Sequence, residues 1–271
     1  MNKQKGVALF QVLLIITILM LLAIFVSNKA KMQVDSAQHI ADKQAAMLDV
    51  TTTLAKIKFN LLAYTTEVLL NKNKWNFYGE EFFIGKVKVT IQDHNGLLFI
   101  NNKTPLKTVK KAIDVAQKMD VSISGVSAET FIDWFSKPKN VRIQNLEQLM
   151  SIGFSFDAAS KLWSFITTNP RVLFNPMNVP KPLMSVYFES SQSQQLLALR
   201  AEKKPYVTVR EMTEVITGIS NDETTGYIMG PYYRVKISAK TGKSHWNMLY
   251  EISIVQRHKG FEIIILSQRP F

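Results

Sequence analysis

The longest apolar run of the chain lies at its beginning, from Val7 to Val26, where Gln11 and Thr17 are the only polar residues. At a rise of ~1.5 Å per residue, a helix of this length spans about 30 Å, the thickness of a bilayer's hydrocarbon core. Leu, Ile, Phe and Val dominate the run, and each favours insertion by roughly 0.3–0.6 kcal/mol at the helix centre. The sequence therefore predicts a transmembrane helix over residues 7–26.

The helical pattern continues beyond this run. Apolar residues recur at steps of three and four from Val34 to Phe59, with Lys, Asp and Gln between them. Neither Gly nor Pro occurs between Val7 and Gly79, so we expect one continuous helix that ends at about residues 62–70. The apolar repeat is too irregular for a coiled-coil stalk to be the preferred interpretation.

Strand patterns follow in two places. Phe82–Ile91 and Leu97–Ile100 flank Asn95-Gly96, a dipeptide that tolerates the positive φ angles of a type I′ turn, and this predicts a β-hairpin. The three segments near the end of the chain predict an antiparallel meander; they are Tyr232–Ala239, Leu249–Gln256 and Phe261–Ser267.

Between these strand regions the pattern is helical. Capping residues and prolines predict helix starts at Pro105, Ser127, Asn145 and Ser155, and Thr208 opens a short helix with a capping box to Glu211. We expect the helix that begins at Ser155 to run through Ile166. The sequence thus predicts an all-helical insert between strands, in an α+β protein.

Charge and composition limit the classes of function that are compatible with this sequence. The formal net charge is +12, which is compatible with nucleic acid, anionic lipid or acidic partners, but the basic residues are spread along the chain as on a diffuse soluble surface. The absence of cysteine excludes disulfides and thiol chemistry. The four histidines lack metal-ligand spacing, and there is neither a Gly-rich phosphate loop nor a nucleophile elbow, so we predict that the protein is not an enzyme.

The junction between the basic leader Met1–Gly6 and the apolar run carries a family resemblance. A removable secretory signal would end at a small-x-small site, which is absent after Val26. The junction instead resembles the class III signal of type IV pilins and type II secretion pseudopilins. The resemblance implies that a prepilin peptidase cuts after Gly6 and that Val7 becomes the methylated N-terminus. Most members carry Glu as the fifth mature residue, where this chain has Gln11.

Two further stretches make the chain similar to the K-type minor pseudopilins of the general secretion pathway. Leu146–Gly153 is similar to part of their helical domain, and Asn175 with Pro180 falls where that domain has an Asn-rich connection; Met177 replaces its second Asn. The resemblance implies a pilin-like fold, in which a long transmembrane helix packs on an antiparallel sheet with an inserted all-helical domain. Its implied parts are a leader at 1–6, a transmembrane helix at 7–26, a periplasmic helix spine with the first strands at 27–102, a helical domain at 103–218, and closing strands at 219–271.

The same resemblance implies a structural role in protein secretion. The protein would sit in the inner membrane with its N-terminus cytoplasmic and its body periplasmic, and would initiate or cap a pseudopilus that exports folded proteins across the outer membrane. Its partners would be other minor pseudopilins, the prepilin peptidase and inner-membrane lipid, with no nucleic acid expected. Calcium binds acidic loops of the family's pilin domain, which makes Asp222 and Glu223 the candidate ligands here, although two adjacent acids are also typical of a solvated turn. No other cofactor is implied.

An alternative function rests on the turn Ile152–Ser155, which resembles a helix-hairpin-helix. Together with the net charge of +12 it suggests a membrane-anchored DNA-binding protein of a competence or type IV pilus system. No Lys or Arg lies between Gln144 and Ser160, where phosphate contacts would be needed, so the structural interpretation of this turn is preferred.

The leader generates the first testable prediction. Replacement Gly6→Val should leave residues 1–6 attached, because the peptidase family requires a residue without a side chain before the cut. N-terminal sequencing of the unmodified protein should begin at Val7, and the variant should begin at Met1. A native chain that begins at Met1, or that is cut near residue 27, would contradict the pilin-type signal.

Overall fold

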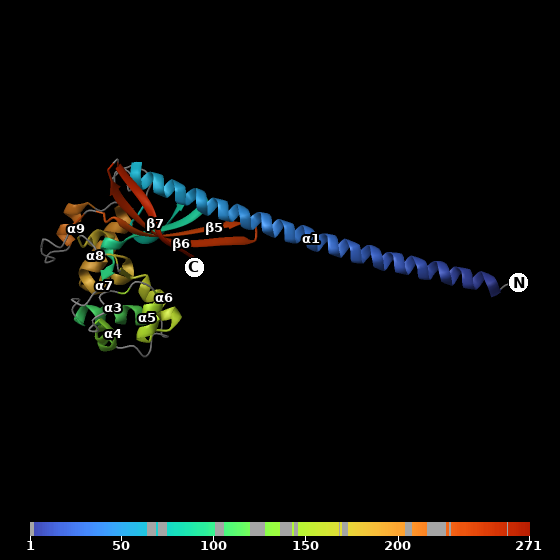
Figure 1. Ribbon diagram of the computed structural model, residues 1–271, viewed down its shortest axis with the longest axis horizontal. Helices are drawn as coiled ribbons and strands as arrows, with labels where there is room; N and C mark the ends of the chain where they lie inside the picture. Colours follow the sequence, from blue (N-terminus) through green and yellow to red (C-terminus); the bar gives the residue numbers. More distant parts are fainter. Residues whose placement is uncertain are drawn as a thin grey trace.

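The computed structural model describes residues 3–63, 69, 75–100, 106–119, 128–135, 143, 146–167, 169, 173–203, 208–215, 226–227, 229–258 and 260–271. A single long helix extends far beyond a mixed body of sheet and short helices (Figure 1). The N-terminus lies at the distal end of this helix, and the C-terminus lies within the body. The protein is therefore an α+β molecule with one projecting rod, as the sequence predicts.

Helix α1 runs without a break from Lys3 to Ala63, which confirms the predicted continuous rod. The large apolar side chains between Leu9 and Val26 are exposed. Among the described residues, α1 is the one helix that is long and apolar enough to cross a membrane. An exposed apolar surface of this length is unfavourable in water and favourable in hydrocarbon.

Five strands form one antiparallel sheet in the order β1-β2-β5-β6-β7. The strands are β1 Tyr78–Ile84, β2 Val87–Asp93, β5 Tyr232–Thr241, β6 Ser244–Arg257 and β7 Gly260–Pro270. The last three confirm the predicted C-terminal meander and extend it by a few residues. The sheet is thus assembled from segments that lie on either side of the helical part of the sequence.

The second half of α1 covers one face of this sheet. Ala46, Val50, Leu54 and Ile57 recur at helical spacing and are buried in one apolar cluster with alternate residues of the strands. The strand residues of this cluster include Val87, Val89, Ile91, Val235, Ile237 and Ile252. One side of the rod therefore completes the core of the sheet.

Polar contacts fix the β5–β6 turn against the middle of α1. The Ser244 hydroxyl lies 2.9 Å from Nδ1 of His39, and the Lys243 amide donates to Asp42 at 3.4 Å. Gly242 has a positive φ of 54°, and a Cβ at this position would collide with the Asp42 carboxylate. The positive φ favours glycine at this turn, and any other residue would displace the Asp42 side chain.

The predicted hairpin is wrong in its position. Its turn is formed by Gly85 and Lys86, where Gly85 has a φ of 63°, and it joins β1 to β2. Asn95 and Gly96 instead belong to a 3₁₀ turn, η1 (His94–Gly96), because the Asp93 carboxylate accepts a hydrogen bond from the Asn95 amide and caps this turn. The chain then leaves the main sheet, and a Cβ at Gly96 would collide with the backbone of Asn178.

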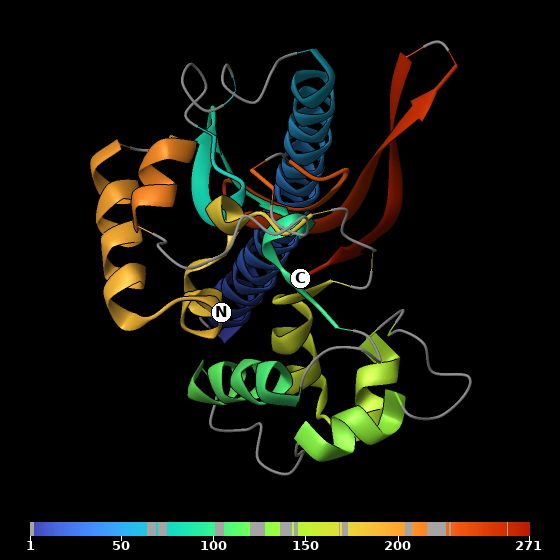
Figure 2. The same cartoon turned by 90° about the vertical axis from the view of Figure 1, so that its left-hand side faces the viewer.

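Between the two parts of the sheet, the described residues are mostly helical. The described helices are α3 Leu106–Met119, α4 Ala128–Phe135, α5 Leu146–Ile152, α6 Phe156–Trp163, η2 Pro176–Asn178, η3 Lys181–Leu183, α7 Met184–Tyr187, α8 Ser190–Lys203 and α9 Val209–Val215. Ser155 caps α6, and Thr208 and Glu211 form the predicted capping box. In Figure 2, helices α3 to α6 lie below the sheet, and α8 and α9 lie beside strands β1 and β2. The buried apolar residues of this segment form their own cluster.

One detail of the all-helical prediction is wrong. Helix α6 ends at Trp163 rather than Ile166, because Ile166–Thr167 form strand β4, which pairs in parallel with β3 (Leu98–Phe99). The Leu98 amide donates to the Phe165 carbonyl at 2.9 Å, which helps to fix this short pairing. The segment that follows β2 is therefore joined by backbone hydrogen bonds to the chain that follows α6.

The packing of α1 on the sheet generates the second prediction. Ile57→Ala should lower the free energy of unfolding of the body by about 2–5 kcal/mol, because Ile57 is completely buried in the apolar cluster. Leu48→Ala is the matched control, since Leu48 is 67% exposed on the same helix and should change stability by less than ~0.5 kcal/mol. Urea denaturation in detergent, followed by near-UV circular dichroism, measures both. Equal losses would show that α1 does not complete the core.

Candidate functional site

The most concentrated group of buried polar side chains lies where the sheet meets the helical segment. Strand β2 contributes Asp93 at its end, β5 contributes Arg234, β6 contributes Glu251, and His94 and Asn178 come from η1 and η2. All five are buried, although charged and polar groups are costly to remove from water unless they are paired. This polar network is the boundary between the two apolar clusters.

Asp93 joins three separate segments. Its carboxylate accepts hydrogen bonds from the Asn95 amide at 2.9 Å, the Asn178 side-chain amide at 2.8 Å and the Gly230 amide at 3.1 Å. Complete burial raises the pKa of Asp93, although these hydrogen bonds oppose the rise. A Cβ at Gly230 would collide with Asp93 and Asn95, so the close approach of this backbone requires glycine. The Asp93 carboxylate therefore holds the end of β2, η2 and the start of β5 together.

Glu251 forms the second centre of the network. Its carboxylate lies 2.6 Å from Nε of Arg234 and 2.7 Å from Nε2 of His94. Burial alone would raise the pKa of Glu251, but the charges of Arg234 and His94 outweigh it and lower the pKa to about 2. Arg234 also donates to the carbonyls of Trp163 and Ile166, while His94 Nδ1 lies 2.8 Å from the Thr167 hydroxyl. These contacts attach the end of α6 and strand β4 to the sheet.

Arg200 from α8 makes a third connection. It donates to the carbonyls of Met177 at 2.7 Å and Val179 at 3.0 Å, and its guanidinium stacks 4.0 Å from the ring centre of Tyr78 in β1. Burial lowers its pKa to about 10, which still leaves the guanidinium charged at neutral pH. Within this network Glu251 pairs with the charged Arg234, whereas Asp93 and Arg200 bond to neutral amide and carbonyl groups. An arrangement of this kind suits the attachment of one structural unit to another.

The structure places the residues of the predicted signal at the distal end of α1. Gly6 and Val7 belong to the helix, whose described side chains begin at Leu9. Gln11 is exposed about one turn after Val7. None of these positions is near the buried polar network (Figure 1). Their roles in cleavage, methylation and assembly stay predictions.

The predicted calcium ligands Asp222 and Glu223 lie outside the described residues. Within the described part of the chain, no three His, Asp or Glu side chains come together in a group able to hold a metal ion. The calcium hypothesis therefore stays untested.

Helix α1 exposes a second apolar surface beside the body, on the side away from the sheet. Ile40 is 56% exposed, Leu48 67% and Leu62 44%, and Phe59 lies on the same part of the helix. These residues extend the exposed apolar run of residues 9–26 beyond the length that a bilayer covers. A surface of this kind is suited to packing against another helix.

The helix-hairpin-helix-like turn joins α5 to α6. Gly153 has a φ of 117°, and Ser155 accepts a hydrogen bond from the Ala158 amide as the cap of α6. Leu149, Ile152 and Phe154 beside the turn are buried in the apolar cluster of the helical segment. The turn thus has a packing role, and nothing in its surroundings adds to the DNA-binding hypothesis.

Sequence reasoning missed the buried polar network. Its residues are divided among segments that lie far apart in the sequence, so they form no contiguous motif. A local signal does exist, because Arg234 stands between Tyr233 and Val235, and Glu251 stands between Tyr250 and Ile252. A single charge inside an otherwise apolar strand indicates a buried partner.

Comparisons with known proteins do not assign this chain to a family. No family model matches the sequence, and no curated protein matches it. Among solved structures, the crystal structure of the GspK–GspI–GspJ complex from the type 2 secretion system of enterotoxigenic Escherichia coli is similar, with a TM-score of 0.43 and 11% sequence identity. The alignment covers 90% of this chain and 99% of the matched chain. A likeness this weak carries no argument about function.

The network generates the third prediction. Glu251→Gln should destabilise the body at pH 7 by about 3–5 kcal/mol, because Arg234 would keep a buried charge without its partner. Glu262→Gln is the control, since Glu262 is an acid of β7 that pairs with Arg257 and is 58% exposed. The control should cost less than ~1 kcal/mol. Urea denaturation at pH 7 compares the two.

The pH dependence supplies a second measurement on the same variant. The pKa of Glu251 lies below its ordinary value of 4.5, so its contribution to stability is present above pH 4.5 and is lost as the pH falls toward 2. The pKa of Asp93 is raised, so its protonation favours the folded state and acts in the opposite direction in both proteins. The stability difference between the unmodified protein and Glu251→Gln should therefore shrink between pH 4.5 and 2. A constant difference would contradict the assigned charge pairing.

Proposed function

We propose that this protein is a membrane-anchored minor pseudopilin of a type II secretion system, most similar to the K type, with a structural rather than catalytic role. The observation that carries the proposal is the division of α1 into two functional halves. Its first half exposes apolar side chains over a membrane's thickness, and one side of its second half completes the core of an antiparallel sheet. A leader that ends in Gly6 directly before this helix adds support from the sequence.

In this proposal α1 performs both anchoring and assembly. Residues 7–26 hold the subunit in the inner membrane, with the N-terminus cytoplasmic and the body periplasmic. After the prepilin peptidase removes residues 1–6, Val7 becomes the N-terminus. The exposed apolar surface around Leu48 then packs against the corresponding helices of other minor pseudopilins.

Gln11 supports a position at the tip of the pseudopilus. In pilin assembly, the Glu at this position is thought to pair with the charged N-terminus of the subunit ahead. An unpaired carboxylate in a membrane costs on the order of 2.5–3.5 kcal/mol at the helix centre. A subunit with none ahead of it has no amine to pair with, and Gln avoids that charge while it keeps its hydrogen-bonding capacity. The exposed amide of Gln11 is compatible with this role.

The helical segment supports the same position. We propose that residues 103–218 form an inserted domain, attached to the sheet by the network around Asp93 and Glu251. The described helices of this domain lie below the sheet and beside its β1–β2 edge, and they enlarge the body considerably (Figure 2). A subunit of this bulk is easier to accommodate at the end of a fibre than between stacked neighbours. In this position it would initiate or cap the pseudopilus that exports folded proteins.

Cysteine crosslinking tests the proposal, because the chain has no cysteine of its own. Leu48→Cys places a thiol on the exposed apolar surface of α1. In cells that carry the secretion genes, it should crosslink to one or two other minor pseudopilins that carry a cysteine on the same helix. Lys181→Cys, an exposed position at the start of η3 in the helical segment, is the control and should give little product.

Two results would contradict the proposal in different ways. Abundant crosslinks between copies of this protein would exclude the tip position but not membership of the fibre. Complete absence of crosslinks to pseudopilins, in a membrane fraction where the protein is present and folded, would contradict the pseudopilin role itself.

A further inference from the structure

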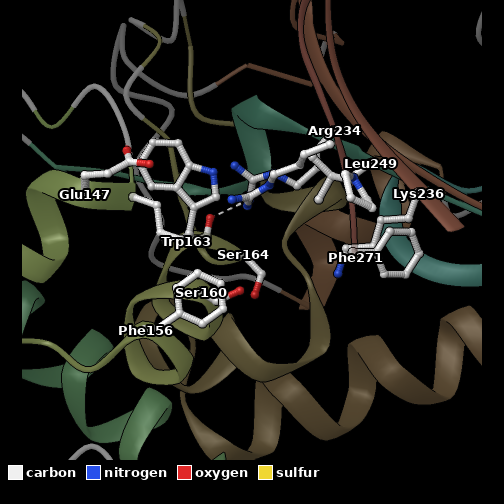
Figure 3. A pocket seen from close by; sticks show the side chains of 12 residues that line it. Glu147, Phe156, Ser160, Trp163, Ser164, Arg234, Lys236, Leu249 and Phe271 are labelled. Atoms are coloured by element: carbon white, nitrogen blue, oxygen red, sulfur yellow. Dashed lines mark hydrogen bonds between the residues drawn. The ribbon is translucent and has the colours of Figure 1, made fainter.

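A hollow lies between the helical segment and the part of the sheet next to the buried polar network. Its volume is about 460 Å³, within the usual range for ligand pockets. Glu147, Phe156, Ser160 and Trp163 approach it from α5 and α6, and Arg234, Lys236 and Leu249 face them from β5 and β6 (Figure 3). Arg269, Pro270 and Phe271 at the end of β7 complete the lining.

The charges around this hollow are unbalanced. Its basic side chains are Arg234, Lys236 and Arg269, and its one acidic side chain is Glu147. Arg234 is already paired with Glu251. Among the described residues, neither Lys236 nor Arg269 forms an ion pair. Two cations at the hollow are therefore available to an anion.

The surroundings of Lys236 disfavour the charged form of its side chain. Burial lowers the pKa of its ammonium group, and the nearby charges of Arg234 and Arg269 lower it further, against the smaller opposing effect of Glu251. The ammonium lies 5.6 Å from the ring centre of Phe271. An anion bound between Lys236 and Arg269 would relieve the repulsion between like charges.

The apolar side chains of the lining indicate a second property of the ligand, which is an apolar group. Phe156 is 60% exposed and Phe271 is 53% exposed, although both rings face a concave site. Trp163 lies on the same side of the hollow as Phe156, and Leu249 lies beside Phe271, so both add apolar surface to the lining (Figure 3). A ligand that carries an apolar group beside its negative charge would cover these rings and contact the two cations at once.

The sheet itself favours an extended protein segment as the source of that ligand. Strand β7, whose end lines the hollow, is an edge strand of the five-stranded sheet. Edge strands present backbone N–H and C=O groups that can pair with an added strand. Ile265 and Leu266 on β7 are also exposed, at 38% and 49%, and would contact such a segment.

We propose that this hollow binds an acidic side chain, Asp or Glu, that stands beside an aromatic or aliphatic residue in an extended segment of a partner protein. The carboxylate lies between Lys236 and Arg269, and the neighbouring apolar side chain packs against Phe156, Trp163 and Phe271. The proposal does not rest on the pseudopilin assignment, because it depends only on the charges and shape of this site.

Fluorescence anisotropy with a labelled peptide tests the proposal on the full chain in neutral detergent. The probe is a short capped peptide with glutamate beside phenylalanine, and its matched analogue carries glutamine in place of glutamate. The glutamate peptide should bind at least about tenfold more tightly, since one charged hydrogen-bonded contact accounts for roughly such a factor. Its affinity should fall as the salt concentration rises.

Single variants locate the binding site. Lys236→Gln and Arg269→Gln should each weaken binding of the glutamate peptide about tenfold and leave the glutamine peptide unchanged. Lys240→Gln is the matched control, because Lys240 is an exposed lysine of the same strand outside the hollow. Far-UV circular dichroism and urea denaturation show that each variant is folded before its affinity is measured.

Three outcomes would overturn the proposal. The first is equal binding of the two peptides, and the second is an equal loss of affinity in Lys240→Gln. The third is binding of a small aromatic acid such as 3-phenylpropionate without binding of the peptide, which would make the occupant a small molecule. None of these results would bear on the crosslinks formed through α1, so failure here and failure of the pseudopilin role are distinguishable.

Discussion

The structure depends on the burial of one face of the antiparallel sheet against one side of α1. Strands β2, β5 and β6 present alternate Val and Ile side chains on this face, and Ala46, Val50, Leu54 and Ile57 of the helix cover them. Without the helix, the same face would be a large apolar patch in water. The helix whose first half is long and apolar enough to cross a membrane is therefore also a core element of the body, so any force on the helix acts directly on the sheet.

On the opposite side of the sheet, buried charged and polar side chains attach the helical segment. The network around Asp93 and Glu251 lies between two apolar clusters that share no buried residue, and it joins them through hydrogen bonds with defined directions. Apolar contacts alone would allow the helical segment to slide over the sheet, whereas the buried side chains of Arg234, Glu251 and His94 approach one another closely in only one orientation of the two parts. Removal of Glu251 would leave the buried charge of Arg234 without its partner, so the orientation of the helical segment is strongly defined. The hollow beside Lys236 and Arg269 exists because this orientation is fixed.

The sequence predicted correctly those elements that are specified by residues close together in the chain. The unbroken apolar and amphipathic pattern before Gly79 gave the length of α1 closely, and Thr208 with Glu211 identified a capping box that is formed as expected. The strands of the C-terminal meander were also correct, because each alternates along its own length and a short turn separates it from the next. The hairpin failed for the opposite reason. Asn95-Gly96 is suited to a type I′ turn, but contacts with Asn175 and Asn178, some eighty residues away, take the chain out of the sheet at this point.

The sequence by itself determined the long apolar run of α1, the basic residues before it, the α+β character and the helical nature of the middle segment, because periodicity and capping are properties of neighbouring residues. Only the tertiary structure decided which strands are neighbours, how the helical segment is attached and where basic side chains collect. Arg234, Lys236 and Arg269 come from two strands that are not adjacent in the sheet, and α5 and α6 close the site from the other side. Their proximity follows from strand order and from the pairing of buried charges, both of which join residues far apart in the chain.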